Sequence, residues 1–324
     1  MNKSGEDYSE DSEIISKFEK LDFYSLWRGR EKVDMLEKSI LSLLMGDIDG
    51  RRILDIGPGN GRLTGIVQKY SDEYVATDIN MSFLKDVKEK YSKEKSLYVA
   101  SNLYHLPFND NSFSSIVMVR VFNFVSRPLK VLEEFSRIIT PGGHLLISIS
   151  PKPSLSTLID DLKYRISYKG PKGQKKPSIT FSNRDKSQVY PASYPTFAFK
   201  RSYISSLFSK AGFTEIAKIS SGLEDYSILR LLPVRSLLRV GLIFRAVPIF
   251  PTTFFLVRKS GNVDISLLEF KEILRCPSCG GKLSTNADRE EVFCGECQFV
   301  GSVKDGITDL TFVPRDAKVI EEGD

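Results

Sequence analysis

The sequence predicts an α/β fold built around a doubly wound sheet, followed by a small metal-binding domain. Two observations predict this organisation. Short apolar strands alternate with helical segments over residues 50–150, and the four cysteines of the chain lie in two close pairs towards the C-terminal end. With 324 residues and 41% hydrophobic content, the chain can bury a substantial core and is long enough for two domains.

The first expected strand, residues 53–56, leads into a glycine-rich turn at residues 57–61, and a helix begins at about Arg62. The turn reads GPGNG. Its three alternate glycines have no Cβ atoms, so the backbone can adopt positive φ and approach a ligand closely. The spacing differs from that of a phosphate loop because no Lys-Ser or Lys-Thr pair follows it. We therefore expect a nucleotide-like ligand at this turn.

A second expected strand, residues 74–77, ends at Asp78, about twenty residues beyond the turn. A carboxylate at this position can accept hydrogen bonds from both ribose hydroxyls of a nucleoside. The turn and the carboxylate together favour a nucleoside site.

The remaining elements continue the alternation. We expect a strand at residues 115–119, a helix at 129–139 that stops at the Pro-Gly-Gly of 141–143, a strand at 144–149 and a last, antiparallel strand at 252–257. Helices are expected ahead of the sheet, at about residues 14–44.

Four stretches of this region occur in a known order: LDIGPGNG, Asp78, ASNLYHLPFNDNSF and EEFSRIITPGGHLLIS. They resemble the successive motifs of class I S-adenosylmethionine-dependent methyltransferases. The subgroup is the methyltransferase type 11 group, with the ubiquinone and menaquinone methyltransferases and the tRNA wobble-uridine methyltransferases. The resemblance covers about residues 20–150 and, more loosely, 197–259. It implies a seven-stranded Rossmann-like sheet and S-adenosylmethionine as cosubstrate.

The same resemblance implies a set of cofactor-binding residues: Asp55, Gly57, Pro58, Gly59, Asn60, Gly61, Asp78, Ile79, Asn102, Leu103 and Val119. Asp55 would orient the turn and approach the methionine amino group, and Asp78 would hold the ribose. Ile79 and Leu103 would lie against the adenine ring. Asn102 stands where the family usually has an aspartate that accepts from the adenine amino group. An amide oxygen can still accept this bond, but it lacks the charge assistance, worth about 1 kcal/mol.

The acceptor of the methyl group is less well defined by the sequence. The Asn-Pro-Pro-Tyr type of motif, which grips a planar amino group in some methyltransferases, is replaced by VRVFNF at residues 119–124, so amino-group methylation of that kind is disfavoured. Arg120 and Asn123 are candidates for contact with a substrate carboxylate or hydroxyl, or they only cap the end of the strand. No catalytic base is identified.

The cysteines form two CxxC pairs, with fourteen residues between them: Cys276, Cys279, Cys294 and Cys297. This spacing predicts a zinc ribbon, in which each pair donates two thiolates. Because four protein thiolates leave no ligand position for water, the zinc would be structural. A disulfide is the alternative, and the expected cytoplasmic location disfavours it.

Residues 267–311 resemble the small zinc-ribbon activator proteins that pair with methyltransferases acting on tRNA, rRNA and translation termination factors. In that family the activator docks beside the catalytic sheet. Here both parts would belong to one polypeptide, which raises their effective concentration. A separate activator subunit would then be unnecessary.

The predicted domains are an N-terminal helical region (1–45), a methyltransferase domain (46–262) and a zinc-ribbon domain (263–324). An insertion at 151–199 mixes lysines, arginines and tyrosines, which suits an anionic substrate such as RNA, or a solvated loop. A second insertion at 223–251 mixes leucines with arginines as in an amphipathic helical pair broken by Pro233 and Pro248. The segment 223–257 could contact an anionic membrane or pack on its own domain.

Three functions stay open. The favoured one is methylation of tRNA, rRNA or a translation factor. The second is membrane-associated methylation of a quinone, a lipid or a lipid-linked sugar, and the third is a non-catalytic scaffold that binds S-adenosylmethionine. No apolar run is long enough to span a bilayer and the N-terminus is acidic, so we expect a cytoplasmic protein, with peripheral membrane contact as an open alternative. A net charge of only +5 excludes a strongly basic protein that coats nucleic acid.

Overall fold

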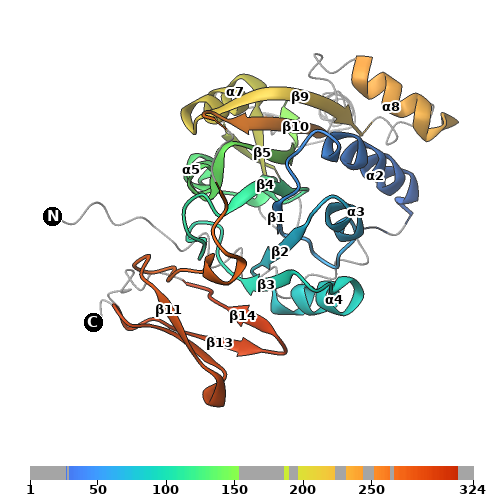
Figure 1. The fold of residues 1–324 in the computed structure, drawn as a ribbon. Coiled ribbons are helices and arrows are strands. Elements are labelled where there is room, and N and C mark those ends of the chain that lie inside the picture. Colours follow the sequence, from blue (N-terminus) through green and yellow to red (C-terminus); the bar gives the residue numbers. More distant parts are fainter. Residues whose placement is uncertain are drawn as a thin grey trace, which may run out of the picture.

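The structure is a computed structural model that describes residue 27 and residues 29–152, 186–189, 196–222, 231–243, 252–262 and 266–312. In these parts of the chain an eleven-stranded mixed sheet forms the centre, with helices on both faces (Figure 1). Seven of its strands come from the middle of the chain: β1 (Arg52–Ile56), β2 (Glu73–Asp78), β3 (Ser96–Ala100), β4 (Phe113–Met118), β5 (Ile139–Ile149), β9 (Phe213–Ser221) and β10 (Thr252–Lys259). Their order is β3-β2-β1-β4-β5-β10-β9, and β10 is antiparallel to both of its neighbours.

The other four strands come from the C-terminal part of the chain: β11 (Leu283–Asn286), β12 (Glu291–Cys294), β13 (Val300–Lys304) and β14 (Ile307–Asp309). They pair with one another in antiparallel fashion, and β14 then pairs in parallel with β3. Thr308 lies beside Val99, and Asp309 lies beside Ala100. The predicted sheet of seven strands is therefore extended to eleven, because the C-terminal strands join its edge.

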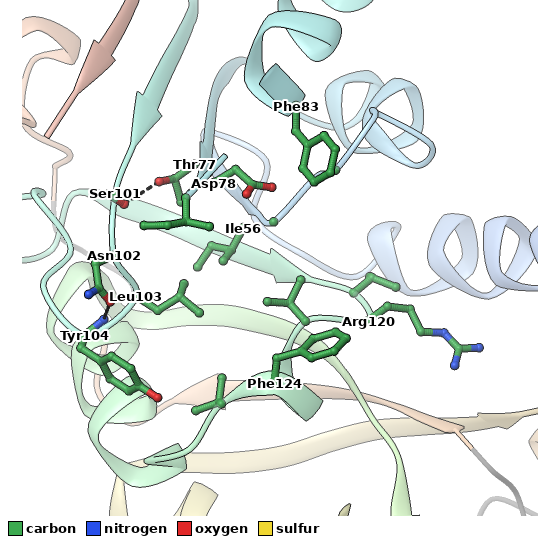
Figure 2. Close-up of a pocket in the computed structure, with 16 residues that line it drawn as sticks. Ile56, Thr77, Asp78, Phe83, Ser101, Asn102, Leu103, Tyr104, Arg120 and Phe124 are labelled. Atoms are coloured by element: carbon green, nitrogen blue, oxygen red, sulfur yellow. Dashed lines mark hydrogen bonds between the residues drawn. The ribbon is translucent and has the colours of Figure 1, made fainter. Parts of the chain in front are cut away.

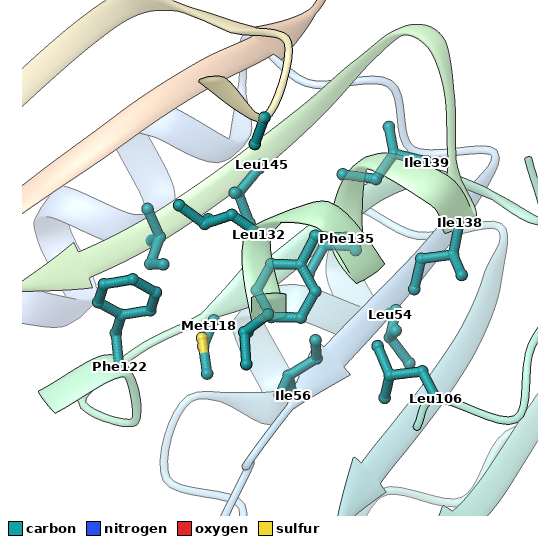
Figure 3. Close-up of a cluster of buried hydrophobic side chains, with 14 of the residues drawn as sticks. Leu54, Ile56, Leu106, Met118, Phe122, Leu132, Phe135, Ile138, Ile139 and Leu145 are labelled. Atoms are coloured by element: carbon teal, nitrogen blue, oxygen red, sulfur yellow. The ribbon is translucent and has the colours of Figure 1, made fainter. Parts of the chain in front are cut away.

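Two groups of helices cover the two faces of the sheet (Figure 1). One face carries α2 (Glu31–Met45), α3 (Thr64–Lys69), α4 (Met81–Tyr91) and α8 (Val234–Ile243), and the other carries α5 (Pro128–Ile138) and α7 (Arg201–Lys210). Each face has its own buried hydrophobic cluster. Leu132 and Phe135 of α5 pack over Leu54 and Ile56 of β1, as Figure 3 shows. Every residue of β1 and β4 is buried, because helices cover both faces of the sheet there, and most of these residues are apolar.

The boundary between α5 and β5 differs from the prediction. The helix ends at Ile138 and the strand begins at Ile139, so the Pro-Gly-Gly of residues 141–143 lies inside the strand. The register of β5 on β4 shifts at this point, and Gly142 has a φ of 75°. These residues form an irregularity within β5. The strand begins before the Pro-Gly-Gly because Ile139 already pairs with Phe113 of β4.

Some predicted segments are only partly described. Of the helices expected at residues 14–44, the structure describes α2, and residues 1–26 lie outside the described residues. In the insertion at 151–199, β6 (Pro151–Lys152), β7 (Lys186–Val189) and β8 (Thr196–Lys200) form a small three-stranded sheet. The rest of this basic insertion, residues 153–185 and 190–195, lies outside the described residues.

Helix α8 is the described part of the insertion at 223–251, and it begins directly after Pro233. Leu237 and Gly241 are buried, and a Cβ atom on Gly241 would lie 2.2 Å from the carbonyl oxygen of Ser220 in β9. Arg235 and Arg239 are exposed on the same helix. One face of α8 therefore packs on the sheet, while its arginines face solvent. Pro248 and Arg245 lie outside the described residues. Within the described ranges, no helix combines the length and apolar content needed to cross a bilayer.

We call residues 266–312 the ribbon segment. Besides the pairing of β14 with β3, it has a second contact with the middle of the chain, where Leu274 forms an isolated bridge with Phe108. The backbone amide of Asn109 donates to the carbonyl oxygen of Ile273 at 2.8 Å. Ile273 and Leu310 are fully buried and belong to the same hydrophobic cluster as α5. The ribbon segment thus shares its core with the central sheet.

Candidate functional site

A pocket opens at the carboxyl ends of β1, β2 and β4 and over the loop that follows β3 (Figure 2). The strand order reverses here, since β2 lies on one side of β1 and β4 on the other, and open α/β sheets bind ligands at this point. The lining residues are Ile56, Gly57, Gly59, Thr77, Asp78, Ile79, Phe83, Ser101, Asn102, Leu103, Tyr104, Val119, Arg120, Val121, Phe124 and Val125.

The glycine turn takes the conformation that its sequence predicts. Gly57, Gly59 and Gly61 have φ values of 63°, 54° and 82°. A Cβ atom on Gly57 would lie 2.4 Å from Cγ2 of Val121, so the turn also needs a glycine there for close packing. Gly59 lines the pocket, where its backbone is open to a ligand. Asn60 beside it has a buried Oδ1 that accepts no hydrogen bond from the described residues.

Asp55 is buried at the end of β1, directly below the turn. Its Oδ2 accepts hydrogen bonds from the Tyr74 hydroxyl at 2.9 Å and from Thr64 Oγ1 at 3.2 Å. Burial raises the pKa of Asp55 to about 6, against the lowering effect of these bonds, and the charge of Asp78 raises it further. A cation close to Asp55 would therefore be bound favourably, because it would compensate a buried negative charge.

Asp78 ends β2 and faces the pocket (Figure 2). Its Oδ1 accepts from the backbone amide of Asn80 at 3.0 Å. Burial raises the pKa of Asp78 to about 6, although backbone amides of Asn80, Gly59 and Ile79 lower it. The carboxylate is held by backbone groups at the position predicted for a ribose ligand, and it can accept hydrogen bonds from a diol.

Asn102 lies in the pocket wall, and its side chain has partners that the sequence did not indicate. Its Oδ1 accepts from the backbone amide of Tyr104 at 3.0 Å, and its Nδ2 donates to the carbonyl oxygen of Phe312 at 3.4 Å. Phe312 belongs to the ribbon segment and also contacts the His105 ring edge to face. The loop at the adenine side of the predicted site thus touches the ribbon segment.

Arg120 follows β4 and has an unusual backbone, with a φ of 64°. Its amide donates to Ser148 Oγ at 2.8 Å. Its guanidinium binds Oε1 of Glu37 through Nε at 2.7 Å and through Nη2 at 2.5 Å. The side chain predicted to meet a substrate is therefore paired with a buried carboxylate on α2.

Asn123 uses both ends of its amide within the protein. Its Nδ2 donates to the carbonyl oxygen of Phe197 at 2.7 Å, and its Oδ1 accepts from the backbone amide of Ser150 at 3.2 Å. These bonds join the end of β5 to β8. The structure therefore favours the capping alternative for Asn123 over substrate contact.

Sequence reasoning missed Glu37, which is fully buried although it carries a charge. A signal was present. Glu37 lies among the apolar residues of α2 that face the sheet, which include Leu36, Ile40 and Leu41. A single acid on a buried helix face indicates a buried partner, but the sequence does not say which cation provides it.

The four cysteines come together in the ribbon segment. Their Sγ atoms all lie within 4.8 Å of one another, with Cys276 to Cys297 at 3.6 Å and Cys279 to Cys294 at 3.5 Å. Disulfide sulfurs would be about 2 Å apart, whereas four sulfurs around a zinc ion at about 2.3 Å lie a little under 4 Å apart. Backbone amides of Gly281 and Glu296 also point at Cys279 and Cys294. The donor set and its spacing fit a tetrahedral zinc ion.

Comparisons with known proteins agree with this geometry. Residues 54–147 match the sequence family described as "Methyltransferase domain". The chain is 35% identical to the ubiquinone/menaquinone biosynthesis C-methyltransferase UbiE of Yersinia enterocolitica over 117 residues. The match covers 34% of this chain and 46% of that protein. The chain is also 29% identical to the uncharacterized protein MJ0638 of Methanocaldococcus jannaschii over 147 residues. This match covers 41% of this chain and 62% of that protein. The chain thus spans about half the length of the curated relatives it matches.

Solved structures share the fold at low sequence identity. The 1,6-didemethyltoxoflavin-N1-methyltransferase of Burkholderia thailandensis, solved with 1,6-didemethyltoxoflavin and S-adenosylhomocysteine, superposes with a TM-score of 0.52 at 14% identity, covering 81% of this chain and 93% of that one. A putative S-adenosylmethionine-dependent methyltransferase from Listeria monocytogenes gives 0.51 at 12% identity, covering 70% and 98%. The fold of the central domain is therefore the Rossmann-like fold of these methyltransferases.

Proposed function

Because residues 54–147 form a methyltransferase domain, we propose that this chain transfers the methyl group of S-adenosylmethionine to an acceptor. One observation carries the proposal. The buried Asp55 and the half-buried Asp78 flank a glycine turn at the point where the strand order reverses. A ligand with a ribose diol and positive charge, as in S-adenosylmethionine, fits such a site.

In the proposed complex the adenosyl group lies in the pocket of Figure 2. Asp78 accepts from the ribose hydroxyls, and Ile79 and Leu103 contact the adenine. Asn102 accepts from the adenine amino group with the remaining lone pair of Oδ1. The sulfonium lies towards Val119 at the end of β4.

The reaction is a displacement at the methyl carbon. The acceptor atom donates an electron pair to the methyl group as the bond to sulfur breaks, and the sulfonium leaves as a neutral thioether. The methyl group is already activated, so the protein supplies mainly proximity and in-line alignment. Among the described residues, Val119, Val121, Phe124 and Val125 give the methyl end of the pocket apolar walls that suit a planar acceptor and exclude water.

The first test is cofactor binding by the variant Gly59→Val, measured by calorimetry with S-adenosylhomocysteine. A branched side chain at Gly59 would occupy the space of the ligand, so binding should be lost. Gly59 has positive φ, and strain alone could weaken the protein. Gly212→Val is the matched control, because Gly212 has a φ of 81° and its Cβ would meet nothing closer than 3.9 Å, far from the pocket lining. Normal affinity in Gly59→Val, or equal loss in both variants, would contradict the assignment.

For the acceptor, we propose first a tRNA, an rRNA or a translation factor. The support is the ribbon segment, which carries the four-cysteine site and lies against β3 as part of the same chain. In this proposal the zinc is structural, and the ribbon segment takes the place of a separate activator subunit.

The second proposed acceptor class is a quinone, a lipid or a lipid-linked sugar at a membrane. Two observations favour it: the similarity to a C-methyltransferase of ubiquinone and menaquinone biosynthesis, and the outer face of α8. On that helix Arg235 and Arg239 are exposed, and Ile243 is 73% exposed. Exposed arginines beside exposed apolar side chains suit an anionic bilayer surface.

One experiment separates these acceptors. The purified protein is incubated with cell RNA, soluble protein and membrane fractions and with S-adenosylmethionine labelled in its methyl group. Label in RNA or protein supports the first class, and label in lipid extracts supports the second. Tight cofactor binding without transfer to any fraction would support a non-catalytic scaffold. In the second case the protein should also sediment with anionic vesicles, and Arg235→Glu with Arg239→Glu should abolish this at unchanged cofactor affinity.

A further inference from the structure

Helices α2 and α8 have apolar side chains on both of their sides. The two helices contact each other and cover the same face of the sheet (Figure 1). Their inner sides are buried, with Leu36 and Ile40 on α2 and Leu237 on α8. Of the nine exposed large apolar side chains among the described residues, five lie on these helices or just before α8: Met35, Leu43, Leu231, Leu242 and Ile243. We call these five residues, together with Arg235 and Arg239, the α2–α8 surface.

The outer side of α2 is more apolar than a solvent-facing side requires. Met35, Ser39 and Leu43 follow one another at intervals of four residues, so they lie along one line of the helix. Met35 is 51% exposed and Leu43 is 48% exposed. The Ser39 hydroxyl between them donates to the carbonyl oxygen of Met35 at 2.8 Å, so its donor is used within the helix. A helix that only covers a sheet has polar residues on its far side, so this line indicates a second contact.

The outer side of α8 combines apolar and cationic side chains. Leu231, before the helix, is 85% exposed, and Leu242 and Ile243 are exposed in its last turn. Arg235 and Arg239 are exposed between them, one helical turn apart. The helix contains no acidic residue, and neither arginine takes part in an ion pair within the described part of the chain. The α2–α8 surface therefore carries positive charge beside its apolar side chains.

The chemistry of this surface distinguishes three kinds of partner. Nucleic acid is disfavoured, because the exposed apolar side chains beside the arginines are aliphatic and offer no aromatic ring to a base. A second copy of the chain is disfavoured, because a two-fold contact through α8 would bring its arginines against the same arginines. An anionic bilayer suits both components, since aliphatic side chains enter the headgroup region and arginines bind anionic headgroups.

We propose that the α2–α8 surface docks this protein on an anionic lipid bilayer. The five apolar side chains enter the boundary between headgroups and acyl chains, and Arg235 and Arg239 contact the anionic headgroups. Both helices lie along the bilayer surface and do not cross it.

The α2–α8 surface begins beside the candidate site. Asp34, next to Met35, binds Arg62 at 2.8 Å, and Arg62 lines a small cavity that shares Gly57 and Val119 with the pocket of Figure 2. A bilayer against α2 therefore brings a lipid-borne acceptor close to the pocket. This deepens the second acceptor class and rests, to that extent, on the proposed function, whereas the docking itself does not depend on methyl transfer.

The first test measures partition of the full chain into lipid vesicles by flotation at physiological ionic strength. Vesicles of phosphatidylglycerol and phosphatidylcholine in equal parts should bind the wild type at least about tenfold more strongly than vesicles of phosphatidylcholine alone. Arg235→Glu with Arg239→Glu should lower the partition into the anionic vesicles by at least about tenfold. Lys282→Glu with Lys304→Glu is the matched control, because it changes the net charge equally at two exposed lysines of the ribbon segment. This control should stay within about twofold of the wild type.

The second test addresses the apolar part of the surface. Met35→Ser with Ile243→Ser should lower the partition into the anionic vesicles by at least about tenfold, because less apolar area leaves water. Val300→Ser is the control, since Val300 is an apolar residue of the ribbon segment with 60% exposure, and its partition should not change. All these side chains are exposed, so every variant should keep the wild-type affinity for S-adenosylhomocysteine, measured by calorimetry.

The docking and the proposed function fail in different ways. If the wild type binds S-adenosylhomocysteine but no vesicles, the function stands and the docking is overturned. If it binds anionic vesicles but not S-adenosylhomocysteine, the docking stands and the function fails. Equal partition into both kinds of vesicle, or an equal loss in the lysine control, would also overturn the docking.

Two further results would assign the surface to another partner and overturn the docking. The first is a dimer in sedimentation equilibrium that Met35→Ser with Ile243→Ser separates, which would identify a second copy of the chain. The second is binding to total tRNA that Arg235→Glu with Arg239→Glu abolishes, without binding to vesicles, which would identify nucleic acid.

Discussion

At the scale of single residues, the site is defined by two acids, of which Asp55 is buried and Asp78 is half-buried in the pocket lining. Asp55 and Asp78 have pKa values of about 6 in the folded chain, above the ordinary value of 3.8. Burial is the main cause for both. Such carboxylates destabilise an empty site at neutral pH, and a cationic ligand relieves the cost. The same two residues therefore couple ligand binding to pH.

Cofactor binding should weaken as the pH falls below about 6, because the charged carboxylates are the binding form. At pH 5 each group is mostly protonated, so the affinity for S-adenosylhomocysteine should be about tenfold or more lower than at pH 7.5. Calorimetry at the two pH values measures this. Asp78→Asn is the control, since removing one titrating group should flatten the dependence. A wild-type affinity for S-adenosylhomocysteine that is constant from pH 7.5 to 5 would contradict this prediction.

The stability of the ligand-free protein should change in the opposite direction. A raised carboxyl pKa means that the folded state binds the proton more tightly than the unfolded state. The contribution of these groups to the free energy of unfolding therefore increases as the pH falls through about 6, and it is complete below the unfolded value near 4. Chemical denaturation of wild type and Asp78→Asn between pH 7.5 and 5 isolates this contribution. A decrease in the free energy of unfolding between pH 7.5 and 5 that is equal in both proteins would contradict this prediction.

At the scale of elements, α8 shows how one helix divides its residues between two environments. Leu237 is 2% exposed against β9, whereas Leu242 is 36% exposed on the outer side. We expect Leu237→Ala to lower the free energy of unfolding by about 2–4 kcal/mol, because it leaves a cavity. Leu242→Ala is the matched control and should cost about 0.5 kcal/mol or less. Similar losses in both variants would mean that α8 packs differently.

The sequence allowed accurate prediction of those elements whose signals are local. The strand and glycine turn at residues 53–61 and the strand that ends at Asp78 are where the sequence places them. The predicted start of β5 at residue 144 was wrong. The strand begins at Ile139, because pairing with β4 outweighs the local signal of the Pro-Gly-Gly at residues 141–143. The pairing of Arg120 with Glu37 joins residues 83 positions apart, and no local pattern indicates it.

At the scale of the whole molecule, the ribbon segment and the sheet share one core. Ile273 and Leu310 are fully buried in it, and β14 pairs with β3. The prediction of a domain beginning at residue 263 located the cysteines but not this pairing, because residues 99 and 308 are brought together only by the complete fold. Loss of the metal should therefore affect more than the ribbon segment.

We expect one zinc ion per chain in elemental analysis, and Cys294→Ser or chelation should lower the melting temperature of the whole protein. Thiolates must be gathered for the metal to bind, so zinc binding and folding of the ribbon segment are coupled. Ser278→Ala, between two of the cysteines, is the control and should retain the metal. A chain that contains no zinc when purified without chelators would contradict the proposal, and so would a metal-free chain with an unchanged melting transition.

The pairing of β14 with β3 also has a consequence for synthesis. Strand β3 is made early, and its partner at residues 307–309 leaves the ribosome some two hundred residues later. During that interval the outer edge of β3 has unpaired peptide groups, which are open to pairing with another chain. Nascent chains released before the ribbon segment is complete should therefore depend on chaperones more than the finished protein does.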